Sequence, residues 1–411
     1  MKENRFQATL LAFRYRNYRL WFTGQTVSLF GTWMQMTVQA VLIYALTKSP
    51  VYLGLVGFAS GIPAWLFTLY GGVIADKMSK RTLLLITQSI MMILAFILSG
   101  LCVSGIVEPW HILLLSFFLG LANAFDSPAR IAFVSELVDR EDLANAVALN
   151  TIMVHLATAI GPAVGSLLFM KFGAGKLGAG FVFFINGLSF LAVIIALLLM
   201  KLSYEKPDHQ NGGTRFLVEG LQYIVHHKVL LSLIGIAAIT SSFGISSVTL
   251  FPAWADKILQ GNAGTNGILQ TARGFGALFS AIYIVSLGRF KFKGKLLTLG
   301  MFCFPIFSLF FALTRWRILS YFLAGTTGFF LIMATSLTLA LCMTLVEPYF
   351  RGRIMSVYSL AFFGFMPIGA LWIGWLGKAI GLAPAMIINA SLYLLFVVII
   401  YLQSPLIRTL E

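Results

Sequence analysis

The sequence predicts an all-α membrane protein with twelve transmembrane helices, and three observations support this fold class. Of 411 residues, 59% are apolar, only 10% are charged, and the mean hydropathy is +0.90. A soluble domain carries about 25% charged residues, so too few polar side chains are present to cover a globule in water. Apolar runs of roughly 20 residues, the length that crosses a bilayer as a helix, recur along the chain. Finally, the basic residues are distributed unevenly between the connections.

The apolar runs divide the chain into two sets of six predicted spans. A single sustained polar stretch, 202–228, separates them, and its second part has the apolar spacing of a helix lying along the membrane face. We therefore predict an N-terminal bundle over 1–201, a cytoplasmic linker with an amphipathic helix over 202–228, and a C-terminal bundle over 229–411. The predicted spans are 20–46, 51–75, 82–105, 109–136, 142–170, 178–201, 229–256, 264–287, 296–314, 317–343, 352–378 and 383–403.

Charge sets the predicted orientation. When a residue at the end of a span is counted with the adjacent connection, the even-numbered connections and both termini hold 21 of the 29 Lys and Arg residues. The odd-numbered connections hold 7, and the one that remains, Arg273, lies inside a span. This asymmetry follows the positive-inside rule and predicts that both termini are cytoplasmic. The net charge of +15 is therefore assigned to topology rather than to nucleic-acid binding.

The two halves also resemble each other. Residues 137–145 open the fifth span as 345–353 open the eleventh, and each is followed by a segment rich in glycine and proline, 160–165 and 365–369. Parallel repeats of this kind are typical of secondary transporters, which bind their substrates near the midplane between the halves. We find no phosphate-binding loop, nucleophile motif, or metal or disulfide spacing. The sequence therefore predicts a protein that is not an enzyme and that carries no cofactor.

The connection between the second and third spans carries the most specific motif. Residues 72–81 read Gly-Val-Ile-Ala-Asp-Lys-Met-Ser-Lys-Arg, which resembles the signature loop of the major facilitator superfamily. The resemblance implies that Asp76 caps the start of the eleventh span, near 352–356, and controls gating. The corresponding loop of the second half, 288–295, lacks the acid. The simpler interpretation is an ordinary basic loop. The predicted gating and charge network consists of Gly72, Asp76, Lys77, Lys80, Arg81, Asp126, Arg130, Glu347, Arg351 and Arg353.

Within that network, Asp126 and Arg130 lie four residues apart in Asp-Ser-Pro-Ala-Arg. This spacing places them on one helical face, where they can pair. The segment resembles the motif of the superfamily's fourth span, which implies that Asp126 also pairs with Lys80 or Arg81. A purely structural ion pair is the alternative.

The fifth span contains Gly161-Pro162-Ala-Val-Gly165. Small residues allow helices to approach closely, and proline removes a backbone hydrogen bond and is expected to bend the helix. The segment resembles the core of a motif found in exporters of the superfamily. Thr151, Met153 and Ala157 stand where that motif has further glycines, and generic helix packing remains the alternative.

Polar residues inside the predicted spans are few, and Arg273 is the most informative. An intramembrane arginine is functional by default, although one near the surface extends its charge into water. If Arg273 is buried, Asp256 or an anionic substrate would balance its charge. A lone intramembrane histidine or glutamine more often forms a hydrogen bond between helices, and most aromatic side chains contact lipid or neighbouring helices. The candidate substrate or proton residues are Gln35, Gln39, His155, Gln270, Arg273, Trp33, Phe243 and Phe329.

The segment that leads into the first span reads Phe13-Arg-Tyr-Arg-Asn-Tyr-Arg-Leu-Trp-Phe22 and continues with Gly24-Gln25 and 31–35. Together with 126–130, this resembles the prokaryotic branch of the superfamily that includes the enterobactin exporter and macrolide-efflux proteins. The resemblance implies a monomeric, multi-pass protein of the bacterial inner membrane that exports an amphipathic small molecule and binds no nucleic acid. No predicted span has an acid at mid-depth, so proton coupling would run through His155 or Asp126, or be absent. The alternatives are a lipid or lysophospholipid transporter, an uncoupled facilitator, and a membrane sensor that transports nothing.

Overall fold

A computed structural model describes residues 11–201, 221–288, 290–347 and 350–410, with the backbone alone at 68–69, 71–73, 75–77 and 409. Twelve helices in these residues are long and apolar enough to cross a membrane, and no strand occurs among them. The predicted fold class is confirmed, and the protein is a multi-pass membrane protein. The predicted cytoplasmic position of both termini stays a prediction.

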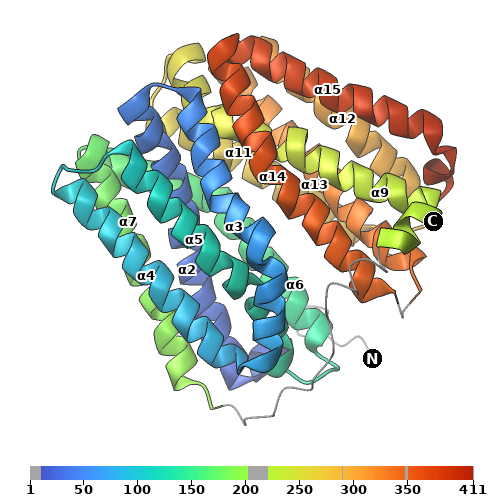
Figure 1. The fold of residues 1–411 in the computed structure, drawn as a ribbon, viewed down its shortest axis with the longest axis horizontal. Helices are drawn as coiled ribbons and strands as arrows, with labels where there is room; N and C mark the ends of the chain where they lie inside the picture. The colour runs from blue at the N-terminus through green and yellow to red at the C-terminus, as the bar shows by residue number, and fades with distance from the viewer. Residues whose placement is uncertain (1–10, 202–220, 289, 348–349, 411) are drawn as a thin grey trace. The chain divides into compact units, whose positions relative to one another are not determined.

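The spanning helices follow the predicted apolar runs closely (Figure 1). Short helices η1 (Leu11–Arg14), η2 (Val134–Glu136) and η6 (Pro405–Thr409) accompany them. The long helices are α2 (Arg16–Thr47), α3 (Pro50–Lys77), α4 (Lys80–Val103), α5 (Pro109–Phe133), α6 (Leu143–Lys171), α7 (Gly175–Leu199), α9 (Lys228–Ile239), α11 (Ala263–Ser286), α12 (Lys293–Leu313), α13 (Arg317–Leu345), α14 (Arg351–Ala379) and α15 (Leu382–Gln403).

Local sequence signals set several helix ends. The Ser79 hydroxyl accepts a hydrogen bond from the Thr82 backbone N–H at 3.1 Å, which caps the start of α4. The Asn262 side chain caps α11 in the same way, accepting from the backbone N–H of Gly264 at 2.9 Å. Gly381 joins α14 to α15 with a φ of 92°, a backbone conformation that glycine adopts without strain.

The contacts divide the chain into two compact units. Unit 1 comprises 1–42 and 63–210, and in it α4 packs against α5 and α7, while α6 packs against α7. Unit 2 comprises 43–62 and 211–411, and in it α13 packs against α11 and α12, while α14 packs against α9 and α15. The short segment 43–62 thus packs with helices from the far end of the sequence.

The predicted linker 202–228 falls mostly on 202–220, which lie outside the described residues. Residues 221–226 are helical, with Ile224 buried and Leu221 and Val225 exposed. The assignment of the whole stretch to an amphipathic helix stays a prediction.

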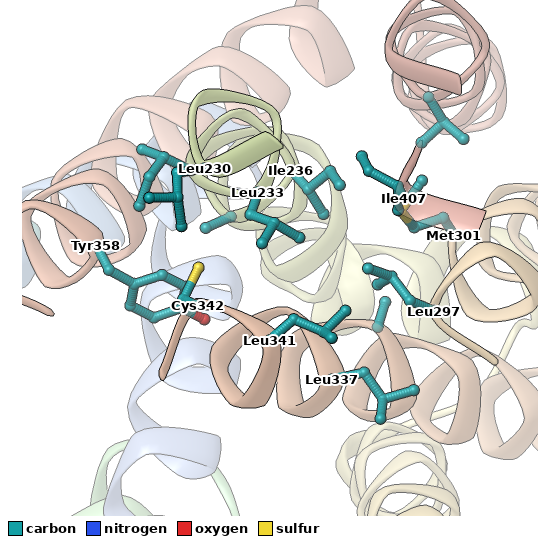
Figure 2. Packing of buried hydrophobic residues seen from close by; sticks show 14 of the residues in the cluster. Leu230, Leu233, Ile236, Leu297, Met301, Leu337, Leu341, Cys342, Tyr358 and Ile407 are labelled. Atoms are coloured by element: carbon teal, nitrogen blue, oxygen red, sulfur yellow. The ribbon is translucent and has the colours of Figure 1, made fainter. Parts of the chain in front are cut away.

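Each unit has its own apolar core. Figure 2 shows part of the core of unit 2, where Leu233 of α9 faces Leu297 of α12 and Leu341 of α13; all three are at most 1% exposed. In unit 1, the ring of Trp21 packs edge-on against Phe133 with centroids 5.2 Å apart. Dispersion contacts of this kind hold helices together in lipid, where the hydrophobic effect is small.

The seventh span departs from regular α-helix through half its length. After α9 it continues as a π-helix, η3 (Thr240–Gly244), a 3₁₀-helix, η4 (Ile245–Leu250), one α-helical turn, α10 (Phe251–Ala253), and a second π-helix, η5 (Trp254–Ile258). We predicted an ordinary span over 229–256 and missed this irregularity. The sequence feature that could have predicted it is the group of hydroxyl residues around Gly244, because serine and threonine side chains compete with backbone N–H groups for helical carbonyl groups. Ser242, for example, donates to the Ala238 carbonyl at 2.9 Å.

Candidate functional site

Helix α11 of unit 2 carries a polar face. Four of its exposed apolar side chains, Ile268, Phe275, Phe279 and Ile282, share one side of the helix, and the exposed Tyr283 and Val285 lie in its last turn. At 3.6 residues per turn, Arg273 lies roughly 150° around the helix from the centre of that apolar side. Asn266 and Gln270 share the face of Arg273. Arg273 therefore points away from the side of α11 that suits lipid, yet its side chain is only partly buried.

The position of Arg273 along the helix excludes snorkelling. It is the eleventh of 24 residues in α11, which places it about 15 Å from one end and about 20 Å from the other at 1.5 Å per residue. An arginine side chain does not span that distance. Arg273 therefore holds its charge at mid-depth.

Asp256 does not balance this charge, so that part of the sequence prediction is wrong. The Asp256 carboxylate instead forms an ion pair with Lys48, with 3.1 Å between Nζ and Oδ2. Lys48 lies in the turn between α2 and α3, and Asp256 lies in η5. Spacing along the sequence gave no sign of this pairing, because 208 residues separate the two side chains.

No carboxylate of the described residues lies within 4 Å of the Arg273 guanidinium. Unit 2 contains four acidic residues, of which Glu219 and Glu411 lie outside the described residues. Glu347 is exposed beyond the end of α13, roughly 28 Å along the helix from the crossing of α11 and α13.

Close packing fixes the backbone that carries Arg273. A methyl group added at Gly328 of α13 would collide with the Arg273 carbonyl, and one added at Gly276 would collide with the Gly325 carbonyl. Small residues at a crossing let two helices approach closely and with a defined geometry. The polar face of α11 is therefore presented on a rigid pair of helices.

Buried amides in unit 1 form hydrogen bonds between helices. The Asn186 amide of α7 donates to Gln35 Oε1 at 2.7 Å, and the Gln39 amide donates to the Ser116 hydroxyl of α5 at 2.7 Å. Their role in substrate binding stays a prediction. His155 is partly buried near the middle of α6 and forms no hydrogen bond or ion pair with the residues that the structure describes.

The candidate aromatic residues lie in both units. In unit 2, Phe329 packs edge-on against Phe330 with centroids 5.3 Å apart, and Phe243 stacks on Phe396 at 5.7 Å. In unit 1, Trp33 contacts Gly161 through its Cβ. All three side chains are partly exposed, and their contact with a substrate stays a prediction.

Among the network residues whose side chains the structure describes, Asp126 is the most deeply buried charged one, at 1% exposure. Its Oδ1 accepts hydrogen bonds from the Thr87 hydroxyl and the Gln88 amide, both at 2.8 Å and both from α4. Arg130 Nε lies 3.6 Å from Oδ2, which confirms the predicted pairing within α5. Two hydrogen bonds and a cation together stabilise the charged carboxylate.

The predicted pairing of Asp126 with Lys80 or Arg81 is wrong. Lys80 Nζ instead contacts Glu136 Oε1 at 2.5 Å, and Arg81 donates to the Leu198 carbonyl at 3.0 Å. Asp126 faces α4 about two turns further along, at Thr87 and Gln88. The motif correctly predicted that Asp126 pairs with Arg130, but it did not predict how α4 is rotated relative to α5, and that rotation decides which α4 side chains reach Asp126.

The remaining network residues divide into two groups. The surroundings of Gly72, Asp76 and Lys77 lie outside the described residues, so their predicted gating role is untested. In the second half, Arg351 Nε donates to the Val346 carbonyl at 3.2 Å, Arg353 lies over the Phe350 ring at 5.1 Å, and Glu347 is exposed. Their membership of a gating network stays a prediction.

The glycines of the fifth span allow α6 and α2 to touch. A methyl group added at Gly161 would lie 2.6 Å from Trp33 Cβ, and one added at Gly165 would lie 2.8 Å from Met34 Cα. Helix α6 is continuous through Pro162. The close approach expected from these small residues is therefore present, whereas the expected bend stays a prediction.

A charge cluster that the sequence did not predict joins η1 to the start of α6. Arg14 forms an ion pair with Asp142 at 2.7 Å, and the Tyr15 hydroxyl lies 2.8 Å from Asp139 Oδ2 and 2.9 Å from Asp142 Oδ2. Burial raises the pKa of Tyr15, so its hydroxyl keeps the proton that it donates to these acids. The acid-rich segment 139–142 was the available signal, but nothing in its spacing identified Arg14 as the partner.

Comparison with known proteins places these features in context. The family described as transmembrane secretion effector matches residues 7–411. The chain is 23% identical to a staphyloferrin A transporter of Staphylococcus aureus over 86% of this chain and 87% of the relative. It is 26% identical to the enterobactin exporter EntS of Shigella flexneri over 95% of this chain and 92% of the relative.

Solved structures share the fold. A bacterial homologue of the human lysosomal transporter Spinster, inward-facing and unoccupied, superimposes with a TM-score of 0.74 at 14% identity, covering 95% of this chain and 97% of that structure. The nucleoside transporter NupG gives a TM-score of 0.71 at 13% identity, covering 94% and 99%. At such identities the likeness concerns the fold alone.

Proposed function

Because the chain belongs to the transmembrane secretion effector family of the major facilitator superfamily, we propose that it exports an amphipathic small molecule, such as a siderophore or antibiotic, by alternating access. The observation that carries this proposal is the length of the match to two siderophore transporters. The similarity to the enterobactin exporter covers 95% of this chain, and the similarity to the staphyloferrin A transporter covers 86%. Both relatives are membrane transporters.

The proposal includes location and energy source. The protein acts in the bacterial inner membrane as a monomer, with both termini in the cytoplasm, as the distribution of basic residues favours. It performs no bond chemistry, needs no cofactor and binds no nucleic acid. Export is coupled to proton entry, and the candidate residues for carrying the proton are His155 and Asp126. The hydrogen bonds to Asp126 support a structural role for it as well.

Transport into inverted vesicles tests the proposal. Purified protein is reconstituted, and uptake of an amphipathic xanthene dye is followed with and without an imposed inward-acid proton gradient, beside protein-free vesicles. Accumulation above equilibrium that requires the gradient supports proton-coupled export. Equilibration without accumulation contradicts the coupling and leaves a facilitator. The absence of any flux contradicts export of small amphiphiles and moves the assignment to a lipid substrate.

A further inference from the structure

Helix α11 carries a positive charge, that of Arg273, for which the described residues supply no carboxylate partner. Arg273 lies at mid-depth on the side of the helix opposite the exposed apolar residues, and its side chain is only partly buried. The exposed part of this side chain is therefore not on the side of α11 that suits lipid. A charged side chain in such a position is costly unless an ion balances it.

The acids of unit 2 do not provide that balance. Asp256 is held by Lys48, and Glu347 lies far along α13 from the crossing with α11. The described residues leave the guanidinium without a carboxylate within 4 Å. The balancing charge must then come from outside these residues.

The same face of α11 carries a second unsatisfied donor. Asn266 is 1% exposed, and its amide nitrogen has no hydrogen-bond partner among the residues that the structure describes. Its oxygen is already approached by the Gln270 amide at 3.4 Å. A buried donor without an acceptor costs roughly 1–3 kcal/mol. A ligand with two acceptor oxygens would therefore stabilise both the Arg273 guanidinium and the Asn266 amide. Asn266 lies about 10 Å from Arg273 along the helix axis, a distance that a drug-sized amphiphile spans.

We propose that the polar face of α11 is an anion-binding subsite, in which Arg273 binds a carboxylate or comparable oxyanion of the transported amphiphile and Asn266 donates to a second oxygen. The proposal rests on the proposed export function and narrows its substrate class from amphiphiles in general to anionic ones. A guanidinium suits this task because its N–H groups match the two oxygens of a carboxylate.

Two dyes of the same scaffold and opposite charge provide the test. Carboxyfluorescein is anionic and rhodamine 123 is cationic, and binding of each to purified protein is measured by fluorescence anisotropy. Wild-type protein is expected to bind carboxyfluorescein, and Arg273→Gln to weaken that binding about 10- to 100-fold, as expected for a charge-assisted hydrogen bond. Arg273→Lys should lose less, because it keeps the charge. Lys295→Gln, which removes an exposed charge from α12, is the matched control and should bind as wild type.

A second variant covers the case in which Arg273→Gln does not fold. Gln270→Glu places a carboxylate three residues from Arg273, where the two side chains pair on the helix surface. The new carboxylate balances the charge of Arg273, so the variant should fold. It should nevertheless lose carboxyfluorescein binding, because the guanidinium is already paired, and it should keep rhodamine 123 binding. Unchanged carboxyfluorescein binding in either variant would overturn the anion subsite.

Vesicle uptake of the same dyes separates this inference from the proposed function. Uptake of rhodamine 123 but not of carboxyfluorescein overturns the anion subsite and leaves export intact. Uptake of neither dye, combined with carboxyfluorescein binding that depends on Arg273, supports the subsite and contradicts export. Uptake of carboxyfluorescein that Arg273→Gln reduces supports both.

Discussion

Lys48 and Asp256 form an ion pair between the α2–α3 turn and η5, with 3.1 Å between Nζ and Oδ2. The backbone of Lys48 is in the left-handed region, with a φ of 50°, and its Nζ lies 5.5 Å from the Tyr44 ring centroid. The two charged side chains are 62% and 41% exposed, so the pair contributes at most about 1 kcal/mol to stability. Its larger effect is to remove Asp256 from the reach of other cations in unit 2.

The strained turn predicts an order of stability among variants at position 48. Both Lys48→Ala and Lys48→Gly remove the ion pair, but only glycine relieves the left-handed backbone, which costs a residue with a Cβ roughly 1 kcal/mol or more. Lys48→Gly is therefore expected to unfold at a higher temperature than Lys48→Ala. Thermal unfolding of both variants in the same detergent tests this order. An Ala variant as stable as the Gly variant would contradict the claim that the backbone at position 48 is strained.

Asp126 is expected to matter through its hydrogen bonds as well as its charge. Asp126→Ala leaves the Gln88 amide without its acceptor and Arg130 without its acid, and should cost about 3 kcal/mol of stability. Asp126→Asn keeps an oxygen acceptor for Thr87 and Gln88 and should cost less. The midpoints of thermal unfolding give the comparison. Equal losses in the two variants would show that charge alone matters.

The contact of α6 with α2 predicts that Gly161→Ala and Gly165→Ala are destabilising, by about 1–3 kcal/mol each as for other overpacked cores. Gly100→Ala in α4 is the matched control, because an added methyl group there meets no atom within 4 Å. It should be neutral or slightly stabilising, since alanine is the better helix former. If all three variants unfold at the same temperature, α6 and α2 are not in close contact.

The signature loop predicts that Asp76→Asn abolishes or cripples dye uptake while membrane insertion stays normal. The substitution keeps the size of the side chain and removes the charge that a helix N-terminus favours. Uptake into vesicles is measured beside the amount of inserted protein. Full uptake by the variant would reject the gating role.

The fold class followed from the sequence because the bilayer imposes it. Long apolar runs have few alternatives to spanning helices, and α2 to α15 begin and end near the predicted bounds. The pairing of Asp126 with Arg130 was equally accessible, since both residues lie on one helix at a fixed spacing. Contacts within one helix can be predicted from a short stretch of sequence, because they depend only on residue spacing.

Contacts between helices were not accessible in the same way. Asp126 meets Thr87 and Gln88 rather than Lys80 or Arg81, because the pairing depends on how α4 and α5 rotate about their axes. In lipid, apolar residues cover every side of a helix and so do not fix that rotation. The ion pair of Lys48 with Asp256 depends on a turn packing near a residue 208 positions further along the sequence. The surroundings of Asp76 were predicted from a motif and remain a prediction.

The irregular seventh span has a consequence for motion within unit 2. An ordinary helix opens most readily at its ends and is best protected in its middle. In this span, π and 3₁₀ hydrogen bonds replace the α-helical ladder over most of 240–258, and such bonds have poorer geometry. The span therefore consists of one regular helix, α9, followed by an irregular segment that runs to its end. Its amide protons should exchange with solvent faster near Gly244 than in α9, an inversion of the usual profile.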